Sequence, residues 1–225
     1  GMRSKETYAT SGTRPIVRFF GGTDLDLDLC GDSDMVSKAY SQGVPMGGAF
    51  GNAASARPPR FLVSALKDAG IDGHPGTDLQ RVQIIKGWVD VSGESHEKVI
   101  DVAGDANNGA SVDPSTCAPT GGGASALCTV WQDDEYDATQ PSFYYVRVLE
   151  NPTCRWSTFQ CQAAGVNPFS ASCEQRALQA SIEAEDNGAP SGVWENCCTN
   201  PVTEPFYTPT IQERAWTSSI WVNAM

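Results

Sequence analysis

Eight cysteines set the strongest limit on how this chain of 225 residues can fold. Their number is even, and the chain also has 22 glycines and 14 prolines, which is typical of disulfide-stabilised exported proteins. A zinc site would need closely spaced ligands, but there is no C-x-x-C motif and only His74 and His96 could assist. We therefore predict a periplasmic or secreted protein with disulfides formed among Cys30, Cys117, Cys128, Cys154, Cys161, Cys173, Cys197 and Cys198.

The spacing of the cysteines favours one particular pair. Cys117 and Cys128 flank a Gly-rich stretch, and a bond between them would close that loop onto the strand that follows. Cys197 and Cys198 are expected to reach two different partners, because a bond between neighbours is strained. The other pairings stay open.

Most periodic segments predict β-strands. They are short apolar or alternating runs bounded by Gly, Pro or other turn residues, at 15–20, 60–67, 80–91, 96–103, 126–132, 142–150 and 218–223. Residues 80–103 read as a hairpin, with a β-bulge expected at Gly87 where the alternation changes phase. Both faces of 142–150 are apolar, which indicates a central strand.

These strands predict an all-β fold, an antiparallel immunoglobulin-like β-sandwich with one or two short helices. We expect one domain over 15–225, interrupted by disulfide-stapled insertions at 104–125 and 151–210. The second insertion contains the most convincing helix, which starts at Ser172 and places Leu178 and Ile182 one turn apart.

The first residues suggest a chain that continues upstream. Export requires a signal peptide and none is present, while "RSKETYATSG" (3–12) reads as the end of a charged helix that leads into a strand. We expect residues 1–14 to be a linker, or the end of a missing upstream catalytic domain.

The net charge of −12 argues against nucleic-acid binding, because the 15 Lys and Arg residues are scattered. The apolar runs are strand-sized, so we also expect no membrane span.

The sequence offers little support for chemistry in this chain. "TDLDLDLCGDSD" (23–34) resembles a calcium loop, but Leu29 and Met35 stand where glycine and glutamate are needed. An edge strand with Leu25, Leu27 and Leu29 facing inward fits it better. "DANNGASVD" (105–113) reads as a solvated loop. No G-x-S-x-G motif accompanies the two histidines, so we assign no catalytic residue, no metal ligand and no cofactor.

Tryptophan and arginine concentrate in two segments, "CRWSTFQC" (154–161) and "QERAWTSSIW" (212–221). Arg155 and Trp156, with Arg214 and Trp216, are the candidate binding residues, because a guanidinium stacked on an indole can form a ligand platform. Aromatic packing over a strand edge is the simpler interpretation.

Several longer strings carry a family resemblance. They are "KETYATSG", "VRFFGG", "GVPMGG", "LQRVQIIKGWVD", "FYYVRVLENPTCRWST" and "IQERAWTSSIWV", in this order. Together they resemble the C-terminal part of a bacterial family called domain of unknown function 3604. The resemblance implies exported proteins whose upstream part is similar to metal-dependent hydrolases of the polymerase-and-histidinol-phosphatase type. Any divalent metal would then belong to the upstream domain, which would be the partner of this chain.

The resemblance implies that this chain is the accessory β-sandwich domain of such a hydrolase. The alternative is a free-standing exported module that binds a carbohydrate or a protein through Trp156, Trp194 or Trp216. Exposure of these rings distinguishes the two interpretations. An enzyme complete within the chain would need His74 or His96 in a pocket with an acid and a nucleophile.

Overall fold

The computed structural model describes residues 1–51, 57–198, 203–204 and 206–224, except for the side chain of His74. The described residues form two compact units, each built around its own core. The first unit contains residues 1–108, 123–151 and 213–225, and the second contains residues 109–122 and 152–212. Within the described chain, no helix has the length and apolar character needed to cross a membrane.

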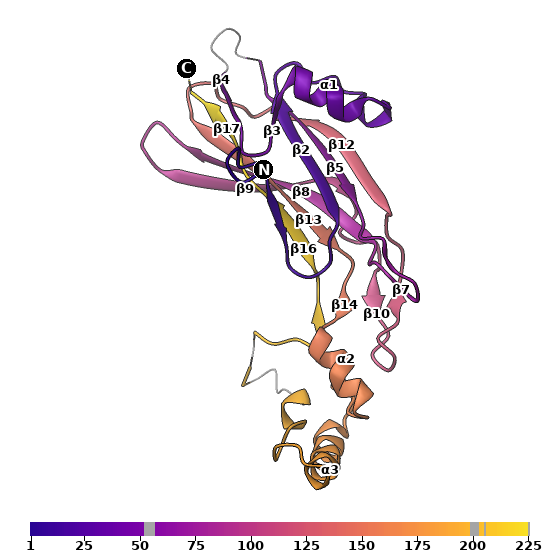
Figure 1. Cartoon of the computed structure of the whole chain (residues 1–225). Helices are drawn as coiled ribbons and strands as arrows, with labels where there is room; N and C mark the ends of the chain where they lie inside the picture. Colours follow the sequence, from indigo (N-terminus) through magenta and orange to yellow (C-terminus); the bar gives the residue numbers. More distant parts are fainter. Residues whose placement is uncertain (52–56, 199–202, 205, 225) are drawn as a thin grey trace. The chain divides into compact units, whose positions relative to one another are not determined.

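The first unit contains two β-sheets (Figure 1). The seven-stranded sheet has the central order β1-β16-β13-β17-β4, and β8 pairs with both β13 and β9. Its strands are β1 (Tyr8–Thr10), β4 (Ala49–Gly51), β8 (Leu79–Val89), β9 (Ser95–Gly104), β13 (Ser142–Glu150), β16 (Arg214–Thr217) and β17 (Ile220–Asn223). All of these pairings are antiparallel except the one between β4 and β17.

The four-stranded sheet has the order β12-β5-β2-β3 and is antiparallel throughout. Its strands are β2 (Ile16–Gly22), β3 (Val44–Pro45), β5 (Arg60–Leu66) and β12 (Ala126–Gln132). A short ribbon of β6 (Gly70–Ile71) and β7 (His74–Pro75) lies between β5 and β8 in the chain.

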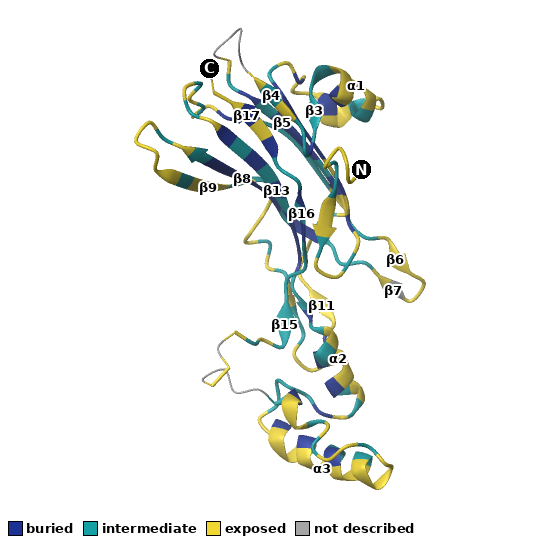
Figure 2. Cartoon of the chain, turned by 60° about the vertical axis from the view of Figure 1, so that its left-hand side comes forward, coloured by how far each residue is buried: buried dark blue, intermediate teal, exposed yellow. Residues whose placement is uncertain are grey.

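The main core lies between the two sheets. Alternate residues of each strand point into it, as period-2 patterning requires, and Figure 2 shows β8 and β13 as largely buried. Phe61 of the four-stranded sheet and Tyr144 of the seven-stranded sheet meet there with ring centroids 4.2 Å apart. The chain is thus mainly antiparallel β-structure, as predicted, and β13 is the central strand expected from its two apolar faces.

A smaller core covers the other face of the four-stranded sheet. Helix α1 (Met35–Gln42) contributes Ala39, and the loop before it contributes Leu25 and Leu29. The edge strand predicted here is wrong. Leu27 is 61% exposed, and the chain turns into a short 3₁₀ helix at Leu29–Gly31. Burial of the other two leucines therefore decides the local structure, and the Asp-Leu alternation does not.

The second unit is small and crosslinked. It contains two short ribbons, two α-helices and a 3₁₀ helix, namely β10 (Ser111–Val112) with β11 (Pro119–Thr120), β14 (Thr153–Cys154) with β15 (Thr210–Ile211), α2 (Trp156–Ala163), α3 (Cys173–Asp186) and η2 (Glu195–Cys197). Figure 2 shows α3 as mostly exposed, and its buried residues form one stripe of Cys173, Ala177 and Ser181. Leu178 and Ile182 of the predicted helix face outward.

All eight cysteines are paired, in the bonds Cys30–Cys128, Cys117–Cys154, Cys161–Cys197 and Cys173–Cys198. The predicted bond between Cys117 and Cys128 is wrong, because these two cysteines belong to different units. The prediction that Cys197 and Cys198 reach different partners is confirmed. The described residues contain three α-helices rather than one or two, and neither α1 nor α2 was predicted from the sequence. Strand β1 lies within the segment 1–14 that was expected to be a linker.

Candidate functional site

The outer face of the seven-stranded sheet carries a group of aromatic side chains. Their strand neighbours Tyr144, Ala215 and Ile220 belong to the core, so the alternating positions face away from it. We call this group the outer aromatic face, and its members are Phe143, Tyr145, Trp216 and Trp221. Trp221 is 52% exposed and the other three are half-buried.

Strand pairing brings these rings together. Phe143 lies directly opposite Trp221, with ring centroids 5.2 Å apart. On its other side Phe143 packs onto Gly87 of β8, where an added Cβ would lie only 2.3 Å from the ring. Gly87 is therefore a site of close backbone approach, and the β-bulge predicted there is wrong. The irregularity between β8 and β9 falls at Val82/Gln83 instead.

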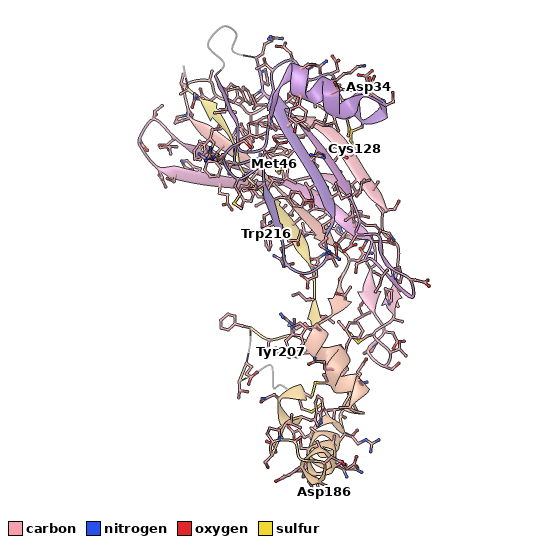
Figure 3. All side chains as sticks on the ribbon, viewed as in Figure 1. Asp34, Met46, Cys128, Asp186, Tyr207 and Trp216 are labelled. Atoms are coloured by element: carbon pink, nitrogen blue, oxygen red, sulfur yellow. A yellow bond between two sulfur atoms is a disulfide. The ribbon has the colours of Figure 1, made fainter. Side chains whose placement is uncertain are left out.

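Trp216 occupies the other end of the outer aromatic face (Figure 3). The Arg214 guanidinium lies over its ring at 5.8 Å, so the structure joins this predicted Arg–Trp pair. Arg147 is directly opposite Trp216 and donates to Gln83 at 2.8 Å, and Gln83 donates to Asp101 at 2.7 Å. The aromatic rings thus adjoin a hydrogen-bonded polar row on the same face.

A hollow of about 370 Å³ borders Trp221. Residues from the N-terminal segment and from the β16–β17 connection line it, including Met2, Lys5, Thr7 and Ser219. Met2 is 91% exposed. This end of the sheet therefore combines an open hollow with two solvent-exposed apolar side chains, Met2 and Trp221.

The other predicted pair, Arg155 and Trp156, lies in the second unit. Trp156 begins α2 and is 73% exposed. Arg155 stacks on Tyr207, which is labelled in Figure 3, at 5.5 Å rather than on Trp156. Arg155 and Tyr207 line an open hollow of about 510 Å³ together with Glu204 and Phe206. The predicted strand edge at this segment is wrong, because Trp156–Ala163 form a helix.

The third candidate ring, Trp194, packs against the disulfide-rich core of the second unit. It is partly buried there, so it does not stand out from the surface as Trp156 does.

His96 lies in β9, next to the turn of the β8–β9 hairpin. Its Nε2 lies 2.8 Å from Asp90, and its ring stacks on Trp88. Asp90 also accepts hydrogen bonds from Ser92 and from the Glu94 amide. Together with the bond to His96, they hold the pKa of Asp90 well below its usual range. Asp90, Glu94 and His96 are close enough to share a metal ion, but the Asp90 oxygens already cap this turn.

Glu150, which the sequence analysis did not single out, is completely buried at the end of β13. One of its oxygens accepts from Thr13 at 2.6 Å, and the other has no hydrogen-bond partner. Burial raises the pKa of Glu150 to about 7, and the nearby Glu213 adds to the shift. Its backbone N–H donates to the Glu213 carbonyl at 2.9 Å, which joins β13 to the segment before β16.

This shift predicts a pH-dependent stability. The pKa of Glu150 is higher in the folded chain than its ordinary 4.5, so folding favours the protonated form. As pH rises from below 4.5 through about 7, the free energy of unfolding should fall by up to ~3 kcal/mol from this group. Glu150→Gln stays neutral and should gain stability over the parent at pH 8 but not at pH 4.5, as measured by urea unfolding.

Glu97→Gln is the control for this prediction, because Glu97 is exposed on β9 of the same unit. It should leave the pH profile unchanged. Parallel profiles for the parent and Glu150→Gln would contradict a neutral buried carboxyl.

Comparison with known proteins gives one match. The family model described as "Protein of unknown function (DUF3604)" matches residues 1–182. No curated protein and no solved structure matches the chain.

Proposed function

The chain belongs to the family described as "Protein of unknown function (DUF3604)", and on this premise we propose that it is an accessory β-sandwich domain of an exported metal-dependent hydrolase. In this role the chain performs no chemistry itself. It docks onto an upstream catalytic domain of the same polypeptide, and that domain holds any divalent metal. The hydrolase part of this proposal rests on the family resemblance.

The outer aromatic face is the observation that supports docking. Sheet faces exposed to water are normally polar, whereas Trp221, Phe143 and their neighbours form an apolar group beside the exposed Met2. Arg147 and the exposed Asp101, which are joined through the buried Gln83, would provide the polar rim of such an interface.

The immunoglobulin-like topology is part of the same proposal. Strands β2, β5 and β12 would correspond to strands A, B and E of that fold, and β8, β13 and β16/β17 to strands C, F and G. Adjacent β12-β5-β2 in one sheet and adjacent β8, β13 and β16/β17 in the other support this assignment. Tyr144 near the start of β13 also donates its hydroxyl proton back to Asp133, much as the tyrosine-corner residue reaches upstream.

Export is supported by the four disulfides, because such bonds persist in oxidising compartments.

Hydroxyl-radical footprinting of the tryptophans tests the docking role. We expect Trp221 to be oxidised readily in this chain alone and to be protected in the full-length protein purified from its source. Trp156, at 73% exposure in the other unit, is the internal control and should react in both samples. Equal oxidation of Trp221 in both samples would contradict docking through this face.

One observation favours a second function, a module that binds a carbohydrate or another exported protein. Trp156 is the most exposed of the three candidate tryptophans, and the hollow lined by Arg155, Glu204 and Tyr207 combines charged and aromatic groups. Footprinting also separates the two functions, because a ligand of this hollow would protect its lining ring Tyr207 and leave Trp221 reactive.

A further inference from the structure

A lysine, an aspartate and a tyrosine meet inside the first unit. Lys86 comes from β8 of the seven-stranded sheet, and Asp133 follows β12 of the four-stranded sheet. The Lys86 Nζ lies 2.5 Å from Asp133 Oδ2, which also accepts from the Tyr144 hydroxyl at 2.6 Å. Lys86 is 6% exposed, Asp133 3% and Tyr144 0%, so this contact between the two sheets is almost free of solvent.

The surroundings hold the amine in place against the carboxyl group. The Lys86 Nζ lies 5.3 Å from the Trp88 ring and 5.9 Å from the Tyr144 ring, and it donates to the Glu135 carbonyl at 3.2 Å. Taking an ion pair out of water costs both charges their hydration, so a neutral product at this position avoids that cost.

We propose that Lys86 and Asp133 join in an amide cross-link between the two sheets. The ammonium passes a proton to the carboxylate, and the free Nζ then attacks the Asp133 Cγ. A bond forms between Nζ and Cγ, the bond between Cγ and Oδ2 breaks, and Oδ2 leaves as water. One ammonium and one carboxylate thus give one amide and one water, with no oxidant, reductant or other reactant.

Two donors are placed to assist this reaction. The backbone N–H of Glu135 donates to Asp133 Oδ1 at 3.1 Å, where it would stabilise the negative charge of the tetrahedral intermediate. The Tyr144 hydroxyl is bonded to Oδ2, the oxygen that leaves, so it acts as the general acid and regains its proton from Nζ. Burial and the adjacent Asp133 raise the pKa of Tyr144, so the hydroxyl returns to its protonated form once the water has left.

The fold supplies proximity and an exit for the water. Both reacting groups are held by separate sheets of one core, which makes the step intramolecular. A hollow of about 200 Å³, lined by Lys86, Asp133, Trp131 and the exposed pair Lys98 and Glu135, opens beside them. The product is shielded by the same aromatic side chains, which limits hydrolysis.

Mass spectrometry of the folded chain tests the cross-link directly. After reduction, alkylation and denaturation, the chain should be lighter than its sequence mass by one water, and tandem spectra should place the loss on a branched peptide joining Lys86 and Asp133. The full sequence mass in the parent protein would overturn the proposal and leave a plain ion pair.

Variants test the assigned roles. Asp133→Asn removes the carboxylate that takes the ammonium proton, so this variant should keep its full sequence mass. Tyr144→Phe keeps the ring and should show an incomplete loss that grows with time, whereas Lys98→Arg, at the exposed pair, should cross-link like the parent. Complete cross-linking of Tyr144→Phe at the parental rate would overturn the role of the hydroxyl.

Discussion

Reducing the disulfides of the second unit is expected to unfold that unit, while the first unit, with its two sheets, stays folded. The core of the second unit has five buried members, and three of these are the cysteines Cys161, Cys173 and Cys197. Such a small core cannot by itself offset the entropy of ordering its chain. Each of its three disulfides closes a loop of 25 to 37 residues and contributes about 3.5–4 kcal/mol in the chain-entropy picture.

Limited trypsin digestion measures this effect. Arg176 lies in α3 of the second unit, and cleavage there should become rapid in a mild reductant. Arg147 lies in the central strand β13 and should resist cleavage under the same conditions. The double variant Cys161→Ser/Cys197→Ser should reproduce the cleavage at Arg176 without a reductant. Continued resistance of Arg176 after complete reduction would show that the helices are stable without the disulfides.

Phe61→Ala should lower the free energy of unfolding of the first unit by about 3–5 kcal/mol. Phe61 is fully buried and connects both sheets, because its ring lies 5.7 Å from Phe19, 6.1 Å from Trp131 and 4.2 Å from Tyr144. Its loss would leave a cavity at the centre of the core, and three large rings cannot close around it without leaving their rotamers.

Urea unfolding followed by tryptophan fluorescence measures this loss. Phe143→Ala is the matched control, because Phe143 is half-buried on the outer aromatic face and should cost markedly less. Phe61→Leu leaves a smaller cavity and extends the measurement if the alanine variant does not fold. Equal losses at positions 61 and 143 would contradict a core centred on Phe61.

The sequence predicts the strands well where the apolar alternation is strong. Strands β5, β8, β12 and β13 lie within a residue or two of their predicted bounds, because one or both of their faces must be buried. The edge strand predicted from the Asp-Leu repeat is wrong, because Leu25 and Leu29 pack with α1 in a small core on the other side of the four-stranded sheet. The β-bulge predicted at Gly87 is wrong because this glycine makes room for the ring of Phe143, which is remote in sequence.

The candidate site follows less directly from the sequence. The contacts that matter most join residues far apart along the chain, so sequence spacing cannot reveal them. They include the disulfides, the ion pair of Lys86 and Asp133, and the pairing of Phe143 with Trp221. The sequence shows the aromatic residues of 142–150, but their alternation indicates only a strand with two apolar faces. Which face meets the core depends on the opposing sheet.

The backbone bond between Glu150 and Glu213 has a consequence for how this fold can diversify. The chain departs from the sheet just after Glu150 and resumes its place at Glu213, so the intervening residues begin and end at one point. The entropic cost of such an excursion grows only with the logarithm of its length. This junction should therefore tolerate inserted segments of quite different length without a change in the register of the sheet.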